Sequence, residues 1–179
     1  MTSPSAFQAL RRWKVAAAII EHEGALLLVQ NRRRNGSLDW STPGGVVEPG
    51  EAVLEGLTRE VLEETGVVVH EWDQLVYTVE TIAVEMGWHL EVEVHRASTW
   101  SGEITIDDPD GIVEEARFVA VEEAVQLLGG SSPWVSEPML SWLEDRWSQT
   151  RAYQFRLTGT DRATATVARI GSPNGSGVD

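Results

Sequence analysis

Three glutamates whose carboxylates can do chemistry together, Glu60, Glu63 and Glu64, fall on one predicted helix. At 100° per residue they occupy an arc of roughly 100°, so we expect three exposed carboxylates side by side. The adjoining side of the helix carries an apolar stripe, made by Leu54, Leu57 and Val61. Clustered carboxylates raise one another's pKa values unless a cation compensates them. Hard oxygen ligands suit Mg²⁺ or Mn²⁺, and Mg²⁺ also takes ligands from substrate phosphates. The pattern indicates a metal-dependent phosphate site; the alternative is a solvated acidic helix face.

The helix that must position these side chains is predicted over residues 52–65. It follows a loop punctuated by proline and glycine, "STPGGVVEPGE", and Gly66 is a natural C-terminal stop. A glycine inside the helix, Gly56, lowers helix stability by about 1 kcal/mol relative to alanine. A glycine at this position is expected if another group approaches the helix closely. Arg59 can pair with Glu63 four residues on, or reach back to Glu51.

The spacing around these residues resembles a known motif. Gly45, five residues, Glu51, seven residues and then "REVLEETGV" match the Nudix box at each of its defined positions. The preceding "WSTPGG" also looks like the usual lead-in to that box. The resemblance extends over residues 13–150.

The resemblance implies an α/β fold, a Nudix-type α/β/α sandwich with a mixed β-sheet. It also implies an enzyme that hydrolyses pyrophosphate bonds in nucleotides, with Mg²⁺ or Mn²⁺ as cofactor. By the same resemblance, the metal ligands are Glu60, Glu63, Glu64 and a backbone carbonyl at Gly44 or Gly45. Glu51 and Arg59 are implied to hold the helix and loop together.

A hydrolase of this kind also needs a general base for the attacking water. In some Nudix enzymes the box helix supplies the base, which here favours Glu60. In others a glutamate on a distal loop does, and Glu114 or Glu115 resembles that position, with Glu115 ranked slightly ahead. The alternative for that pair is a charge at a strand end.

Candidate substrate-binding residues lie on either side of the box. Three consecutive arginines in an otherwise acidic chain can meet phosphates, although we expect at least one to be solvated: Arg32, Arg33 and Arg34. Trp40 and Trp88 can stack on a nucleobase, and the alternative for Trp40 is a wall or core residue. His89 is predicted beside Trp88, where a packing or hydrogen-bonding role is the alternative to substrate binding.

Substrate class follows only by elimination. The subfamily signatures for ADP-ribose, diadenosine polyphosphates and coenzyme A do not fit the sequence well, which leaves nucleoside triphosphates, including oxidised ones. Two alternatives stay open: a pyrophosphatase for ADP-ribose or another nucleotide sugar, and an inactive nucleotide-binding regulatory module.

The remaining segments frame this domain. Residues 1–12 are predicted to be a lead-in, residues 151–170 a β-hairpin extension, and residues 171–179 a disordered tail. Tyr153, Phe155 and Leu157 alternate with polar residues in the hairpin, so one of its faces requires burial. That face covers either the chain's own sheet or a second subunit, and we expect a homodimer.

The composition restricts the possible partners. The 179 residues carry a net charge of −14, which disfavours binding to nucleic acids or to anionic membranes. The chain has no cysteine, so disulfides and thiolate catalysis are excluded. The longest early apolar run, Val15–Ile20, is too short for a signal peptide or a membrane span. We therefore expect a cytoplasmic protein whose partner is a small nucleotide.

Overall fold

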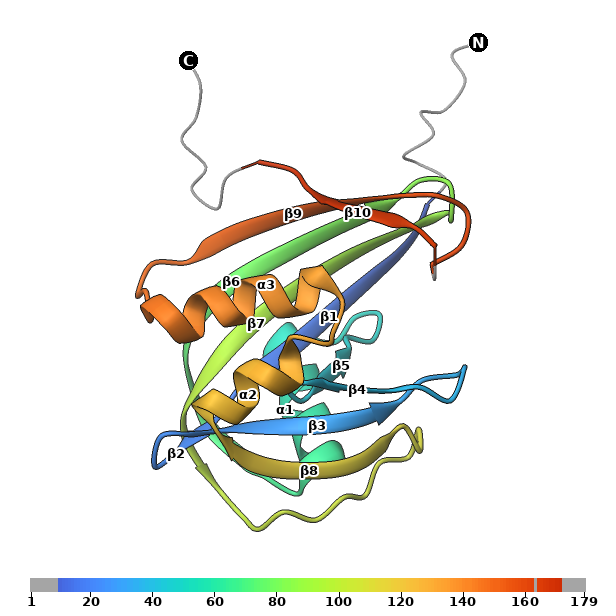
Figure 1. The fold of residues 1–179 in the computed structure, drawn as a ribbon. Helices are drawn as coiled ribbons and strands as arrows, with labels where there is room; N and C mark the ends of the chain where they lie inside the picture. The colour runs from blue at the N-terminus through green and yellow to red at the C-terminus, as the bar shows by residue number, and fades with distance from the viewer. Residues whose placement is uncertain (1–9, 163, 172–179) are drawn as a thin grey trace.

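A six-stranded mixed sheet is the largest part of the fold (Figure 1). In the computed structural model, which describes residues 10–162 and 164–171, its strands lie in the order β10-β9-β6-β7-β1-β5. Their bounds are β1 (Arg11–Ile19), β5 (Gly44–Val46), β6 (Val68–Ala83), β7 (Trp88–Ser101), β9 (Arg151–Thr158) and β10 (Thr166–Arg169). The β1–β7 and β6–β9 pairs are parallel and the others antiparallel, which makes the sheet mixed.

A smaller antiparallel sheet lies beside it. Its strands are β2 (Glu21–His22), β3 (Ala25–Arg32), β4 (Leu38–Ser41) and β8 (Val113–Ala120). Strand β3 is central, with β8 on one side and β2 and β4 on the other. Its consecutive residues from Leu26 to Val29 are all buried, as expected for a strand covered on both faces.

Helices cover both faces of the sheets, which confirms the predicted α/β class (Figure 1). Helix α1 (Val53–Thr65) buries Leu57 and Val61 in one core cluster. On the opposite side, α2 (Val121–Leu128) and α3 (Pro133–Asp145) contribute Leu128 and Met139 to a second cluster. None of the helices in the described part of the chain combines the length and apolar character that spanning a bilayer requires.

The predicted C-terminal hairpin forms and joins the main sheet. Strand β9 pairs in parallel with β6, and β10 pairs with β9. Tyr153, Phe155 and Leu157 are at most 2% exposed and belong to the same core cluster as α3. Of the two alternatives for the hairpin's apolar face, the structure shows burial against the chain's own core.

Several predicted boundaries differ from the structure. Strand β1 begins at Arg11, inside the predicted lead-in, because Arg11 and Arg12 pair with β7. The polar residues 31–40 predict a loop, but they include the end of β3 and most of β4, because β4 lies at a sheet edge, where polar side chains are accepted. The valine-rich residues 67–72 and 75–86 predict two separate strands, but β6 is continuous from Val68 to Ala83 through several register shifts. Residues 1–9 and 172–179 lie outside the described residues.

Candidate active site

Helix α1 ends and packs as its sequence predicts, with one exception. Gly66 caps it in the left-handed conformation (φ 75°), and its N–H donates to the Leu62 carbonyl. Leu57 and Val61 are fully buried against the sheets, but Leu54 is 38% exposed, so the apolar stripe is narrower than predicted. The glutamates of α1 are therefore fixed on a well-anchored helix.

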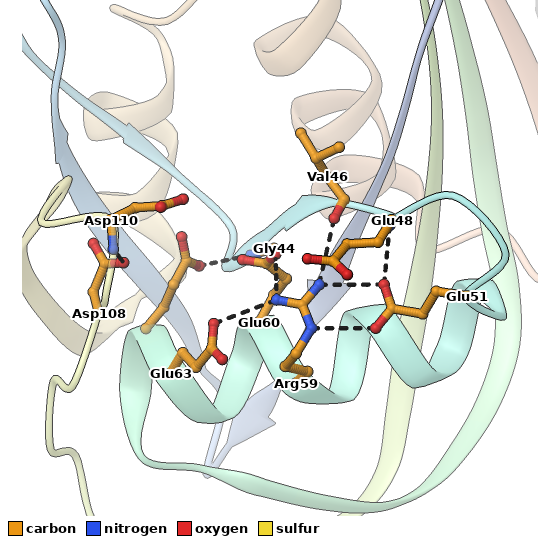
Figure 2. A network of polar contacts seen from close by, with 10 residues as sticks. Gly44, Val46, Glu48, Glu51, Arg59, Glu60, Glu63, Asp108 and Asp110 are labelled. Atoms are coloured by element: carbon orange, nitrogen blue, oxygen red, sulfur yellow. Dashed lines mark hydrogen bonds and ion pairs between the residues drawn. The ribbon is translucent and has the colours of Figure 1, made fainter.

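Arg59 is the centre of a polar network that holds the preceding loop against α1 (Figure 2). Its guanidinium donates to both carboxylate oxygens of Glu51 at 3.2 Å, to Glu60 at 2.8 Å and to Glu63 at 3.3 Å. This hydrogen bonding raises the pKa of Arg59 and, together with the Glu48 N–H, lowers the pKa of Glu51. The geometry fits the supporting role implied for Glu51 and Arg59.

Two glycines make room for these carboxylates. A Cβ on Gly45 would lie 2.3 Å from a carboxylate oxygen of Glu60. A Cβ on Gly56 would lie 2.6 Å from a carboxylate oxygen of Glu51. The group that approaches α1 closely at Gly56 is thus the side chain of Glu51.

Glu64 is buried, which corrects the expectation that it is exposed. It is 9% exposed, and its Oε2 accepts a hydrogen bond of 2.8 Å from the Gly44 N–H. Burial raises the pKa of Glu64 from an ordinary 4.5 to about 8, and the nearby charges of Glu60 and Asp108 act in the same direction. Arg33 and the Gly44 N–H oppose this shift but do not cancel it. A nearby cation would stabilise the ionised form of this buried carboxylate.

Two aspartates missed by the sequence reasoning join the site. Asp108 and Asp110 line the same cavity as Glu60 and Glu64, and both lie beside α1 on the loop between β7 and β8 (Figure 2). Burial raises the pKa of Glu60, and Asp110 adds to the rise. The acidic run "DDPDG" is the signal that could have found them, although nothing in it predicts which loop lies against α1.

Backbone hydrogen bonds tie this loop to the end of α1. The N–H of Thr105 donates to the Thr65 carbonyl, and that of Asp107 donates to the Glu63 carbonyl, both at 2.9 Å. Asp108 accepts from the backbone N–H groups of the next turn, those of Asp110, Ile112 and Val113. The loop therefore holds its carboxylates beside α1 in a fixed place.

These carboxylates form one end of a cavity of about 380 Å³. The other end is apolar and lies between the six-stranded sheet and helices α2 and α3. Its floor includes Val79, Val92 and Leu90, and its roof includes Leu128, Val135 and Met139. Such a cavity suits a ligand with a phosphate part and an apolar, planar part.

The donor set fits a hard divalent cation. Glu60, Glu64, Asp108 and Asp110 bring only oxygen ligands, and two of them have raised pKa values that a cation would reverse. In the side-chain conformations of the structure, no three acidic or histidine residues within residues 10–162 and 164–171 are grouped closely enough to hold a metal ion. Glu60 and Glu63 instead accept hydrogen bonds from Arg59, so binding a metal requires their side chains to turn away from it.

The structure does not bring Glu114 or Glu115 to the cavity. Glu114 accepts a hydrogen bond from Arg32, and Glu115 pairs with Arg117 at 2.7 Å. Both are partly exposed, and neither lines the cavity. The pairing with Arg32 lowers the pKa of Glu114 and raises that of Arg32.

The candidate substrate-binding residues are dispersed. Arg33 lines the acidic end of the cavity and pairs with Asp39, but Arg32 and Arg34 do not line it. Trp40 is a buried core residue. Trp88 lines a second hollow that adjoins the first. His89 is buried and contacts Glu80 at 2.9 Å, outside both cavities.

A family model for the NUDIX domain matches residues 10–143. The chain belongs to the Nudix family. Members are generally metal-dependent hydrolases of small nucleotide substrates, so this chain is a Nudix pyrophosphohydrolase. The match ends before β9, so the C-terminal hairpin lies outside the part shared with the family.

Individual relatives support the same assignment. A MutT-like protein from Streptomyces ambofaciens is 34% identical over 126 residues, covering 68% of this chain and 79% of that protein. The 8-oxo-dGDP phosphatase NUDT18 of Mus musculus is 29% identical over 124 residues, 69% of this chain but only 33% of the mouse protein. The crystal structure of a MutT Nudix hydrolase from Burkholderia pseudomallei superposes with a TM-score of 0.55 at 28% identity, covering 63% of this chain and 85% of that one.

Proposed function

We propose that this Nudix enzyme hydrolyses a phosphoanhydride bond in a nucleoside triphosphate, ordinary or oxidised, with Mg²⁺ or Mn²⁺ at the acidic end of the cavity. One observation carries the proposal: a single cavity joins four carboxylates at one end to an apolar slot at the other. Metal-bound phosphates suit the acidic end, and a nucleobase suits the slot. The similarity to an 8-oxo-dGDP phosphatase supports including oxidised nucleotides.

The metal would be held by side chains from two elements. Glu60, Glu63 and Glu64 come from α1, and the loop before β8 adds Asp108 and Asp110. Gly45 lies against Glu60, where its backbone carbonyl is the further ligand expected from the Nudix box. When bound, the cation neutralises charge on the phosphates and lowers the pKa of a coordinated water.

The protein's own groups complete the mechanism. Glu60 and Asp110 both line the cavity, and either can accept the proton of the attacking water. Asp110 thereby takes the role that the sequence suggested for Glu114 or Glu115, whose side chains pair with arginines outside the cavity. Arg33 lies at the same end and can neutralise a phosphate oxygen.

A substrate screen tests this function. The purified chain is incubated with Mg²⁺ or Mn²⁺ and a panel of nucleotides, and release of phosphate and pyrophosphate is measured. The panel contains nucleoside triphosphates, oxidised purine triphosphates, ADP-ribose, other nucleotide sugars and dinucleoside polyphosphates. We expect metal-dependent turnover of a triphosphate that Glu64→Gln abolishes.

Two results would oppose the proposal. Faster turnover of ADP-ribose than of any triphosphate would favour the nucleotide-sugar alternative. No turnover, with a nucleotide still raising the melting temperature, would indicate a regulatory binding module.

The homodimer stays a prediction. The apolar face of the hairpin is buried within the chain, which leaves the outer edge of β10 for a second copy. Among the described residues no strand pairs with β10 along that edge. Light scattering after size-exclusion chromatography measures the mass in solution. A dimer through this edge should become monomeric in a Val167→Pro variant, because proline cannot donate a backbone hydrogen bond.

A further inference from the structure

The substrate cavity continues beyond the apolar slot along the sheet. Alternate residues of β1 line its floor: Ala17 beside Gly44, then Val15 beside Val46, and then Trp13. At about 3.3 Å per residue, Ala17 and Trp13 lie about 13 Å apart. The floor therefore runs from the acidic end towards a second hollow of about 320 Å³.

The second hollow is continuous with the substrate cavity. Five side chains line both: Val15, Val46, Leu90, Trp134 and Arg162. The second hollow has two further lining residues, Trp13 and Trp88, which do not line the substrate cavity. The two hollows thus make one groove whose far end is apolar and aromatic.

Arg162 is the one cation of this far end within the described residues. It lies in the loop between β9 and β10, outside the residues shared with the family. Its guanidinium carbon is 5.4 Å from the centre of the Trp134 ring, within the range of a cation–π contact. The ring of Trp134 in turn packs edge-to-face against Trp88 at 6.5 Å, which fixes its position.

No acidic side chain in the described part of the chain pairs with Arg162. The other cation of the groove, Arg33, lies at the acidic end and pairs with Asp39. The N–H groups of Arg162 are thus available to a ligand at the end of the groove furthest from the carboxylates.

We propose that Arg162 is a specificity-determining residue that selects nucleotides whose base is a 6-oxopurine, that is, guanine or hypoxanthine and their oxidised forms. This inference rests on the proposed function, because it requires the substrate to bind with its phosphates at the acidic end of the cavity. The base lies in the slot between the sheet and helices α2 and α3, with one edge facing Arg162.

The hydrogen-bonding pattern of the base gives the selectivity. Arginine has five donors and no acceptor. The edge of guanine or hypoxanthine offers two acceptors, O6 and N7, which match a guanidinium, whereas adenine presents a donor at the 6-position. An oxidised guanine keeps the O6 acceptor. The C-terminal hairpin would therefore supply the residue that recognises the base, whereas the Nudix domain would bind the phosphates.

Uncharged nucleosides separate base recognition from the metal and the phosphates. Binding of inosine and of adenosine is measured by quenching of tryptophan fluorescence in the wild type and in Arg162→Ala, Arg162→Lys and Arg156→Ala. Arg156 is the matched control, because it is an exposed arginine of the same hairpin that lines neither hollow. In parallel, kcat and KM are measured with the 6-oxopurine and 6-aminopurine triphosphates.

We expect the wild type and Arg156→Ala to bind inosine roughly tenfold more tightly than adenosine. Arg162→Ala should reduce this ratio to near one, and Arg162→Lys should keep only part of it, since lysine cannot donate in a bidentate way. KM for the 6-oxopurine triphosphate should rise in Arg162→Ala while kcat stays unchanged.

The proposal is overturned if the wild type does not prefer inosine, or if Arg162→Ala leaves the ratio unchanged. It is also overturned if Arg156→Ala reduces the ratio as much as Arg162→Ala does. Failure of the proposed function has a different signature: no turnover of any nucleotide, while the inosine preference and its dependence on Arg162 persist.

Discussion

Replacing Glu64 by glutamine should make the metal-free protein less sensitive to pH. The carboxyl of Glu64 has a pKa of about 8 in the folded chain, against an ordinary value of 4.5. A raised pKa means that the folded state holds the proton more tightly than the unfolded state does. The contribution of Glu64 to stability is therefore complete below pH 4.5 and is lost as pH rises towards 8.

The size of the effect follows from that difference. One pH unit corresponds to 1.36 kcal/mol, so the full cost of ionising Glu64 in the folded state is about 5 kcal/mol. About 2 kcal/mol of this cost is already present at pH 6, and most of the rest develops between pH 6 and pH 9. The free energy of unfolding should fall by about 2–3 kcal/mol across that interval on account of Glu64 alone.

Urea unfolding followed by tryptophan fluorescence, with EDTA present, measures this change. Glutamine can still accept the hydrogen bond from the Gly44 N–H but has no charge to bury. We expect the Glu64→Gln variant to lose about 2–3 kcal/mol less than the wild type between pH 6 and pH 9. Glu122→Gln, an exposed change on α2, should follow the wild type.

Mg²⁺ should remove most of the wild-type loss at pH 9, because it binds the ionised form and only in the folded state. Equal pH dependence in the wild type and Glu64→Gln would show that ionisation of Glu64 does not destabilise the folded chain. So would an Mg²⁺ effect that is just as large in the variant.

Three further predictions concern other parts of the site and its support. Gly45→Ala should lower kcat/KM at least about tenfold with little change in melting temperature, because the new Cβ displaces the flexible Glu60 carboxylate; wild-type activity would contradict this. Arg59→Ala should lower the free energy of unfolding by about 1–3 kcal/mol in urea titrations, since Glu51 loses both of its bonds to the guanidinium; an unchanged midpoint would contradict it. Phe155→Ala should cost about 3–5 kcal/mol, whereas Arg156→Ala on the opposite face should cost less than about 0.5; similar losses would show that the hairpin is not part of the core.

The sequence predicts the parts of the site that depend on local spacing. Helix α1, its Gly66 cap and the pairing of Arg59 with both Glu51 and Glu63 all follow from residues within one or two turns of one another. The likeness to the Nudix box adds the fold, which the family match confirms. Burial of Glu64 could not be predicted in this way, because the loop and sheet that cover it are brought there by tertiary packing.

The residues missed or misplaced are positioned by contacts that the local sequence pattern does not encode. Asp110 reaches α1 because the loop between β7 and β8 forms backbone hydrogen bonds with the helix end, which no local pattern encodes. Glu115 does not line the cavity, and its side chain pairs with Arg117, two residues along the same strand. Arg162 borders the groove because β9 pairs in parallel with β6, a contact between residues more than 70 positions apart.

Binding of Mn²⁺, followed by loss of its free-ion electron paramagnetic resonance signal, is the most direct test of a metal site at the acidic end of the cavity. We predict that the wild type binds Mn²⁺ and that Glu64→Gln and Asp110→Asn each weaken binding, the former at least about tenfold. Glu115→Gln, outside the cavity, should bind as the wild type does. Unchanged Mn²⁺ affinity in Glu64→Gln, or a loss confined to Glu115→Gln, would contradict a metal site built from α1 and the loop before β8.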